Sequence, residues 1–247
     1  MSVVPSEPFL RAFHAVHPGV TRRAFARGGS YARLAARIPA GARVLDLGCG
    51  DGPLLALVPG AIGLDLSRAE LAAAGGVVVQ GRAQALPFAT AAFDVVACHL
   101  ALMLFDDAPA VVAELARVLA PGGRLLAVLG GGPVALAPDA VPDAFHRFLA
   151  LLPPGGRRLG DPRLRTEAGW RSLLPGWALA PWERWELDLA GTPDEVWPLL
   201  GGSYEVTAEA APALRTAWDA AVADLVAPDG RVPCRAAVYL AEARRPG

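Results

Sequence analysis

The stretch that decides the predicted fold is Val44-Leu45-Asp46-Leu47-Gly48-Cys49-Gly50-Asp51-Gly52. It starts as a short, almost entirely apolar run, as buried strands of parallel sheets do, and it ends in three glycines at alternate positions. Because glycine lacks a Cβ atom, its backbone can turn sharply and approach a ligand closely. We therefore expect a strand that ends in a tight ligand-binding turn. A short helix over residues 54–58 is expected next, with free N–H groups at its N-terminus.

Two aspartates indicate what this turn binds. The dinucleotide fingerprint is spaced Gly-x-Gly-x-x-Gly, whereas the glycines here are spaced Gly-x-Gly-x-Gly. Asp46 precedes the first glycine, where a carboxylate repels a pyrophosphate and attracts an ammonium or sulfonium group. Asp65, 13 residues after Gly52, is expected to end the next strand, where it can accept hydrogen bonds from both ribose hydroxyls. The pattern favours a cationic nucleoside, with plain turn or capping aspartates as the alternative.

Apolar runs and amphipathic stretches alternate on either side of this turn. Strands are expected at 43–47, 61–65, 77–79, 93–98 and 124–129. Helices are expected at 68–74, with Ser67 as N-cap and Glu70 completing a capping box, and from Asp106 or Asp107 to Leu119. This alternation predicts an α/β fold with a parallel sheet covered by helices on both faces.

The flanking regions are expected to belong to the same single domain, residues 1–247. Residues 3–38 have helical spacing with a break at 17–19, and residues 41–133 hold the strands described above. Helices at 142–152 and 166–174 predict a helical insertion over 134–176 after the fifth strand. The remainder, 177–247, is expected to contain strands at 179–189 and 235–241 and helices at 194–200 and 208–226.

The composition excludes several classes of function. The formal net charge is −1, from 23 basic and 24 acidic residues, so no nucleic-acid partner is expected. The chain contains neither lysine nor asparagine, which excludes Schiff-base lysine chemistry and a P-loop. The longest charge-free run, Leu125–Pro138, is too short and too broken by glycine and proline to span a membrane. Cys49, Cys98 and Cys234 are too widely spaced for a disulfide framework or a metal site, so a cytoplasmic setting is expected.

Four stretches match one known family in order and in spacing. They are Val44–Gly52, Gly63–Ser67, Gln84–Phe88 with the following Phe93–Val96, and Glu114–Gly123. Over about residues 40–130 the chain therefore resembles a class I S-adenosylmethionine-dependent methyltransferase of the small-molecule type. The resemblance implies a Rossmann-like seven-stranded sheet of order 3-2-1-4-5-7-6 with an antiparallel last strand. It also implies S-adenosylmethionine as cofactor, a small-molecule substrate, and a helical lid formed by residues 1–40.

The resemblance also implies which residues bind the cofactor. The methionine portion would contact Asp46, Gly48, Gly50 and His99; the ribose would contact Asp65; and the adenine would contact Leu66, Ala83 and Gln84. Arg82 departs from the family pattern, because the family often has an aspartate at this position. An arginine cannot accept a hydrogen bond from the adenine amino group. That contact is expected to pass to the backbone or to Gln84.

Histidines and tyrosines are the candidates for catalysis. A methyl acceptor sometimes needs a base, and His14, His99 and Tyr204 are the residues that we expect to act on it. Tyr31 and Tyr204 are expected to line the pocket, where an aromatic face stabilises a sulfonium. Core packing is the alternative for each of these residues. His14 and His17 have helical spacing, but no acidic or cysteine cluster supports a metal site.

Two further features suggest alternatives for the acceptor. Arginines 157, 158, 163 and 165 form a basic loop that would suit a carboxylate, a phosphate or a carrier-bound acceptor, unless the loop is simply solvated. The tryptophans between residues 170 and 197 have core spacing, or they line an apolar acceptor site.

Three functions remain in competition. The leading hypothesis is a methyltransferase acting on a small molecule in bacterial secondary metabolism. The second is an enzyme that cyclises S-adenosylmethionine to azetidine-2-carboxylate and releases methylthioadenosine, which a closed, aromatic-lined site without an acceptor pocket would favour. The third is a non-catalytic binding module, against which the intact glycine motif speaks.

Overall fold

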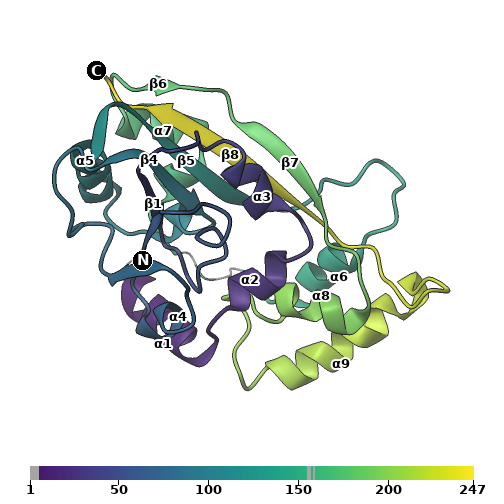
Figure 1. The fold of residues 1–247 in the computed structure, drawn as a ribbon. Helices are drawn as coiled ribbons and strands as arrows, with labels where there is room; N and C mark the ends of the chain where they lie inside the picture. Colours follow the sequence, from purple (N-terminus) through teal and green to yellow (C-terminus); the bar gives the residue numbers. More distant parts are fainter. Residues whose placement is uncertain (1–5, 155–156, 158) are drawn as a thin grey trace.

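One mixed sheet organises the protein, which we describe from a computed structural model covering residues 6–154, 157 and 159–247. The strand order is β3-β2-β1-β4-β5-β8-β6, with β7 also paired to β8 (Figure 1). Strands β1 to β5 run parallel, and β8 is antiparallel to β5, β6 and β7. The strands are β1 Val44–Leu47, β2 Ile62–Asp65, β3 Val77–Gln80, β4 Phe93–His99, β5 Leu119–Pro133, β6 Ala178–Leu179, β7 Glu183–Asp188 and β8 Arg235–Arg244.

The predicted topology is confirmed. Where one strand was expected over 179–189, the structure has β6 and β7, separated by residues 180–182, which include Pro181. Both pieces pair with β8, so the order matches the expected 3-2-1-4-5-7-6 when they are counted as one interrupted strand. A proline cannot donate to a strand ladder, which accounts for the interruption.

Helices cover both faces of the sheet. They are α1 Ser6–Val16, α2 Val20–Phe25, α3 Ser30–Ala35, α4 Arg68–Leu71, α5 Ala108–Val118, α6 Ala144–Leu151, α7 Glu167–Leu173, α8 Pro193–Leu200 and α9 Ala211–Val222, with short 3-10 turns η1 Leu102–Leu104, η2 Pro162–Arg165 and η3 Ala223–Leu225. Side chains of β4 alternate between two buried clusters. Val95 and Ala97 join the cluster under α3, α6, α8 and α9, whereas Val96 and Cys98 join the one under α5 and α7.

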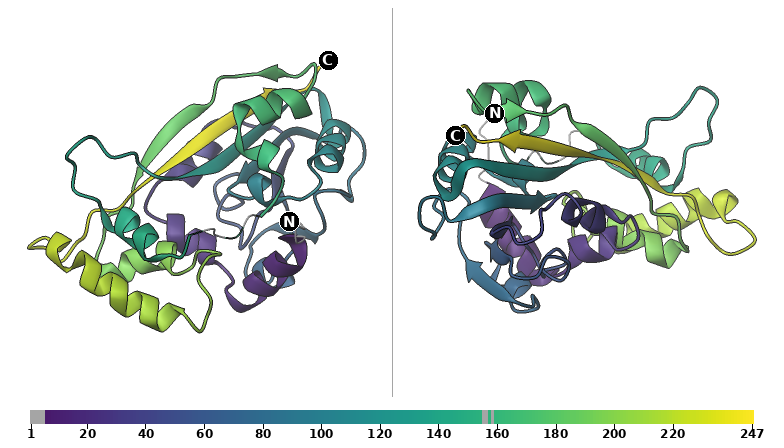
Figure 2. Two further views of the ribbon diagram at one scale, coloured as in Figure 1. Left: turned by 180° about the vertical axis from the view of Figure 1, so that it is seen from behind. Right: turned by 45° about the horizontal axis from the view of Figure 1, so that its top comes forward.

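The helices α2, α6, α8 and α9 gather beside one end of the sheet, as two views of the ribbon agree (Figure 1, Figure 2). Helix α2 packs on α8, and α6 packs on α9. Elsewhere along the carboxyl ends of the parallel strands, α1 lies against α4 (Figure 1). The carboxyl ends of the parallel strands are therefore enclosed by helices from both ends of the chain.

The prediction of a helix at residues 54–58 is wrong. Ala56 N donates to Gly52 O and Val58 N donates to Leu54 O, at 3.2 and 3.0 Å, but the segment forms only hydrogen-bonded turns. Pro59 follows the segment directly, and a proline disfavours helical geometry at the residue before it, here Val58.

Smaller differences concern where elements end. The break at 17–19 is confirmed, but a second break at 26–29 separates α2 from α3, and Gly29 there has φ 68°. Helix α4 stops at Leu71 rather than at residue 74. Strand β5 begins at Leu119 rather than at residue 124, because an irregularity in its pairing with β4 absorbs residues 120–123.

In the part of the chain that the structure describes, no helix has the length and apolar character needed to cross a membrane. Among the same residues, no three or more His, Cys, Asp or Glu side chains are grouped as metal ligands.

Candidate functional site

Two adjoining cavities lie at the carboxyl ends of β1, β2 and β4. We call the first, of about 100 Å³, the outer cavity; its wall includes Glu7, Arg82 and Phe105. We call the second, of about 70 Å³, the inner cavity; its wall includes Tyr31 and Glu70. The residues that line both are His14, Gly48, Asp65, Ala101 and Leu104.

These two cavities bring together every site residue predicted from the sequence. The outer cavity is lined by Leu66, Ala83 and Gln84, together with the shared His14, Gly48 and Asp65. The inner cavity is lined by the same three shared residues and by Asp46, Gly50, Tyr31, His99 and Tyr204. The expected adenine and methionine residues thus separate into the outer and the inner cavity, with the expected ribose residue between them. Their individual roles stay predictions.

The glycine turn after β1 is fixed against β2. Gly48 N and Cys49 N both donate to Leu64 O, at 2.7 and 3.0 Å. Gly48 has φ 73°, and a Cβ atom there would lie 2.5 Å from the Cβ of Ala101. A residue with a side chain would therefore be strained and would fill the space where the two cavities meet. The turn leaves a cradle in which a ligand can contact the backbone directly.

Asp65 is oriented by the same turn. Its Oδ2 accepts a hydrogen bond from Gly50 N at 2.9 Å, and its Oδ1 accepts one from Ser67 N at 2.7 Å. Burial raises the pKa of this carboxyl, whereas the two backbone bonds oppose that shift. Each carboxylate oxygen retains a further lone pair on the cavity side, so the group can accept from two vicinal hydroxyls.

Asp46 is the most unusual group of the inner cavity. Its side chain is buried, and its Oδ2 has no hydrogen-bond partner. Burial, together with the nearby negative charge of Asp65, raises the pKa of Asp46 to about 8. An unsatisfied buried carboxylate is costly unless a cation or a donor approaches it. The inner cavity therefore fits a ligand that brings a positive group to this oxygen.

Negative charge dominates the inner cavity. Its lining includes four carboxyl groups, those of Asp46, Asp51, Asp65 and Glu70, and Asp46, whose pKa is raised, becomes negative when a cation approaches. Among the described residues that line it, Arg22 is the one arginine; it is half exposed and lies 3.3 Å from Asp51. Such a field attracts a ligand with an ammonium or sulfonium group and repels an anionic one, apart from a carboxylate held at Arg22.

A chain of three polar side chains crosses the inner cavity. His14 Nδ1 lies 2.7 Å from Glu70 Oε1, and His14 Nε2 lies 3.1 Å from the hydroxyl of Tyr204. Because a carboxylate only accepts, Nδ1 carries the proton toward Glu70 when the imidazole is neutral, and Nε2 accepts from the tyrosine. Two candidates that are 190 positions apart in the sequence are thus joined by one hydrogen bond.

Glu70 was missed as a site residue. Ser67 Oγ does accept from Glu70 N, at 3.4 Å, as a cap should. The Glu70 side chain, however, does not complete the expected box; its Oε2 accepts from Gly19 N at 2.8 Å and its other oxygen contacts His14. The carboxyl group is buried, whereas one in a capping box is usually exposed. Because the capping-box motif of Ser67 and Glu70 already accounts for a glutamate at this position, the sequence did not indicate Glu70 as a site residue.

His99 occupies the opposite wall of the inner cavity. Its Nε2 lies 2.8 Å from Ser30 Oγ, and its ring stacks on that of Tyr31 with centroids 3.7 Å apart. Burial lowers the pKa of His99 to about 3, so the imidazole is neutral. Its Nδ1 is buried without a partner. This neutral ring, together with Tyr31, offers an aromatic face beside the acidic groups.

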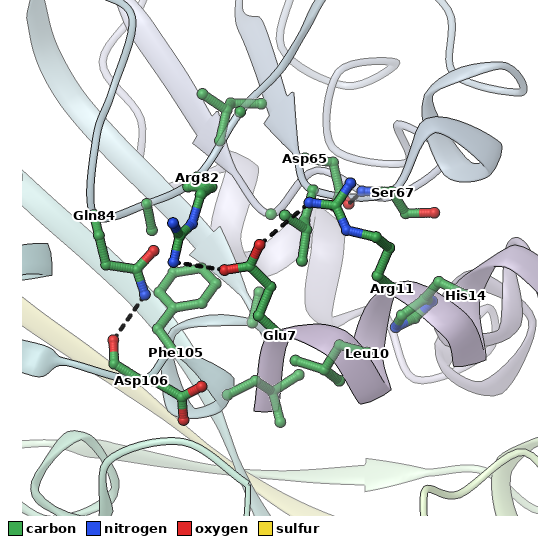
Figure 3. A pocket seen from close by; sticks show the side chains of 17 residues that line it. Glu7, Leu10, Arg11, His14, Asp65, Ser67, Arg82, Gln84, Phe105 and Asp106 are labelled. Carbon is green, nitrogen blue, oxygen red and sulfur yellow. Dashed lines mark hydrogen bonds and ion pairs between the residues drawn. The ribbon is translucent and has the colours of Figure 1, made fainter. Parts of the chain in front are cut away.

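Helix α1 closes the outer cavity. Arg82 and Glu7 form an ion pair of 2.7 Å across its mouth, and Glu7 also contacts Arg11 (Figure 3). Ser6 N and Oγ both donate to the carboxylate of Asp106. Gln84 Nε2 donates to the Asp106 carbonyl, which leaves its amide oxygen free to accept. Both cavities are smaller than the ~300–1,000 Å³ of typical ligand sites.

Other residues considered in the sequence lie elsewhere. Arg157 stacks over Phe9, Arg163 pairs with Asp161, and Arg165 donates to a backbone carbonyl, while Arg158 lies outside the described residues. His146 bonds to Asp143, and His17 lies beside Phe13. The tryptophans at 170, 182, 185 and 197 pack in the core clusters and not around either cavity.

Comparison with known proteins agrees with this geometry. The family described as "Methyltransferase domain" matches residues 45–127. An uncharacterised methyltransferase, YcgJ of Bacillus subtilis, is 31% identical over 166 residues, covering 60% of this chain and 61% of that protein. Nocamycin O-methyltransferase of Saccharothrix syringae is 35% identical over 162 residues, covering 52% and 57% of the two chains. The chain therefore spans between about half and three fifths of these relatives.

Solved structures share the fold. The crystal structure of YcgJ superposes with a TM-score of 0.58 at 24% identity, covering 88% of this chain and 98% of that one. The [4+2]-cyclase SpnF superposes with a TM-score of 0.57 at 19% identity, covering 100% and 98%. The architecture is that of a nucleotide-binding α/β domain with its ligand site at the carboxyl ends of the strands. Residues 45–127 match the methyltransferase domain family, and the fold around them is that of class I S-adenosylmethionine-dependent methyltransferases.

Proposed function

We propose that this protein is an S-adenosylmethionine-dependent methyltransferase that acts on a small molecule. The observation that carries the proposal is the unpartnered, buried Oδ2 of Asp46, which lies in a cavity with three further carboxylates. A cationic amino acid portion would satisfy that oxygen. Asp65, held between Gly50 N and Ser67 N, would accept the ribose hydroxyls. The bound cofactor would supply an electrophilic methyl group.

The residues around the cofactor would position it and exclude water. Arg22 would hold the carboxylate of the methionine portion, and the stacked rings of Tyr31 and His99 would face the sulfonium. Leu66 and Phe105 would enclose the adenine in the outer cavity. Helix α1 would act as the lid, because its Glu7 and Ser6 are tied to the two loops that border this cavity. The name of one relative, nocamycin O-methyltransferase, supports a small-molecule acceptor.

A second reaction has one observation in its favour. In the cyclisation to azetidine-2-carboxylate, the amine nitrogen bonds to the γ-carbon as the carbon–sulfur bond breaks, and the electron pair leaves on sulfur in methylthioadenosine. The amine must lose a proton. Asp46, whose carboxyl has a pKa of about 8, would receive it within the aromatic-lined inner cavity. We keep this reaction as the second candidate.

One experiment separates these functions. The pure protein is incubated with S-adenosylmethionine and no acceptor, and the products are analysed by mass spectrometry while binding is measured by calorimetry. Bound but unchanged cofactor is the expected result for a methyltransferase. Methylthioadenosine above the non-enzymatic background would instead establish cyclisation. Failure of the cofactor to bind would contradict both.

A further inference from the structure

A third cavity adjoins the inner one. It measures about 270 Å³, and we call it the apolar cavity. Its walls come from α2, from the segment between α8 and α9, and from the facing strands β5 and β8, with Phe145 of α6 and Met103 of η1. Thr21, Leu100 and Tyr204 line both this cavity and the inner cavity. The two spaces therefore share one wall at the carboxyl end of β4.

The walls of this cavity are almost free of charge. They are formed mainly by aliphatic and aromatic side chains, among them Val20, Phe25, Phe145, Leu199 and Val238. Although the chain contains 23 basic residues, none is among the described residues that line this space. The one ionisable acid is Glu205, which is exposed and whose Oε2 accepts from Arg157 N at 2.7 Å. An anionic molecule would find no positive partner here and would lose its hydration.

An irregularity in the pairing of β5 with β8 opens the cavity toward the sheet. The pairing of β5 with β8 shifts register between Gly130 and Gly132, and both glycines line the cavity. An added Cβ at Gly132 would meet nothing within 4 Å. Ala236 and Ala237 of β8, which pair with Pro133 and Gly132, also have small side chains. Small residues where the end of β5 meets the start of β8 leave a space that larger side chains would fill.

The polar groups of the cavity are hydroxyls. Ser203 Oγ is buried without a partner, and the hydroxyls of Thr21 and Tyr204 belong to residues of the shared wall. Tyr204 is joined through His14 to the buried carboxylate of Glu70. A neutral amine attacks a methyl group without losing a proton first, whereas a neutral hydroxyl is a weak nucleophile that needs a base. A chain that ends in a buried carboxylate suits an acceptor hydroxyl.

We propose that the apolar cavity binds the methyl acceptor, and that this acceptor is a small, uncharged, apolar molecule with a hydroxyl group, of the phenol type. This inference rests on the proposed function. As the acceptor oxygen bonds to the methyl carbon, the methyl–sulfur bond breaks and its electron pair stays on sulfur. The acceptor proton passes to the Tyr204 oxygen while the tyrosine proton passes to His14 Nε2. Glu70 stabilises the resulting imidazolium.

The test starts with the demethylated cofactor, S-adenosylhomocysteine, whose binding is measured by calorimetry. Its complex is then titrated with two pairs of probes, phenol with benzoate and naphthol with naphthoate. We expect at least one neutral hydroxyl probe to bind saturably, and at least tenfold more tightly than the carboxylate with the same ring. Absence of S-adenosylhomocysteine binding would count against the proposed function itself.

Filling the cavity gives the second measurement. Ala24→Phe, on the cavity face of α2, should weaken binding of the hydroxyl probe at least tenfold and leave the affinity for S-adenosylhomocysteine within about twofold. Phe145→Trp fills the same space from α6, and it is used in place of Ala24→Phe if that variant does not fold. Ala26→Phe, at an exposed position just after α2, is the matched control.

Three outcomes would overturn the acceptor assignment while the cofactor complex forms normally. They are binding of the carboxylate probes as tight as that of the hydroxyl probes, no binding of any neutral hydroxyl probe, and a filled cavity that leaves probe binding unchanged.

Discussion

The inner and the apolar cavities share one wall but differ in charge. The inner cavity has four carboxylates in its lining, whereas the apolar cavity has one, at an exposed position on its rim. Thr21, Leu100 and Tyr204 separate them. Because charges interact strongly in a poorly hydrated interior, this arrangement concentrates negative potential where a cation would bind. It leaves the neighbouring space suited to an uncharged partner.

The largest expected effect comes from removing the hydroxyl that links the two cavities. Tyr204→Phe should lower kcat for a neutral hydroxyl acceptor about 100-fold or more, because the acceptor proton loses its path to His14. Affinity for S-adenosylhomocysteine should change little. The remaining activity should rise steeply with pH, since only spontaneously ionised acceptor reacts. Stopped assays with mass-spectrometric detection across a pH range measure this. Tyr239→Phe, in β8, is the control, and an unchanged kcat in Tyr204→Phe would exclude the relay.

The second effect concerns the boundary between the outer and inner cavities. Asp65→Ala should weaken S-adenosylmethionine binding by about 1–3 kcal/mol, because charge-assisted hydrogen bonds to the ribose are lost. Gly50 N and Ser67 N also lose their acceptor, so the turn itself loosens. Calorimetry on wild type and variant gives the difference in Kd. Equal affinities would show that Asp65 does not contact the ligand.

The third effect tests the charge of the inner cavity through pH. Asp46 has a pKa of about 8 in the folded protein, above its unfolded value, so the folded state binds this proton more tightly. In the ligand-free protein, the contribution of Asp46 to the free energy of unfolding is therefore fully present below about pH 4 and is lost as the pH rises toward 8. Asp46→Asn should melt like wild type at pH 3–4 and at a higher Tm than wild type at pH 8–9.

Ligand binding should offset the loss of stability that the ionised Asp46 carboxylate causes. A cationic ligand favours the ionised carboxylate, so S-adenosylmethionine binding at pH 7 should release protons from wild type and release fewer from Asp46→Asn. Calorimetry in two buffers of different ionisation enthalpy counts these protons. The affinity of Asp46→Asn should also fall below that of wild type. Identical proton release by the two proteins would place the cation elsewhere.

The smallest effect is expected at the ion pair between Glu7 of α1 and Arg82. The Glu7–Arg82 pair is partly exposed, and such pairs contribute no more than about 1 kcal/mol. Glu7→Gln and Arg82→Met should each change the Kd for S-adenosylhomocysteine less than about fivefold, and the coupling between them should weaken at high salt. A double-mutant cycle at two salt concentrations measures it. A much larger loss in Arg82→Met alone would mean that Arg82 contacts the cofactor itself.

Sequence reasoning succeeded where the physical signal is local. The apolar run at 44–47 followed by alternate glycines has few structural solutions, and β1, its turn and the position of Asp65 at the end of β2 follow from it. It failed where local signals compete. Residues 54–58 have helical spacing, but Pro59 follows directly and disfavours helical geometry at Val58. Glu70 matches a capping box, yet burial under α1 turns its carboxylate toward His14 and Gly19.

The sequence by itself determined the α/β order of the core, because this depends on short-range periodicity and on glycines at fixed positions. The strand order and the residues that border the two cavities followed from the family resemblance of four stretches at matching spacing. Only the tertiary structure decided that Tyr204 meets His14 and that an apolar cavity opens beside them. The first contact joins residues 190 positions apart, and the cavity is lined by residues from Val20 to Val238. No short-range pattern encodes such a distance, since it is set by how the helices pack against the two ends of the sheet.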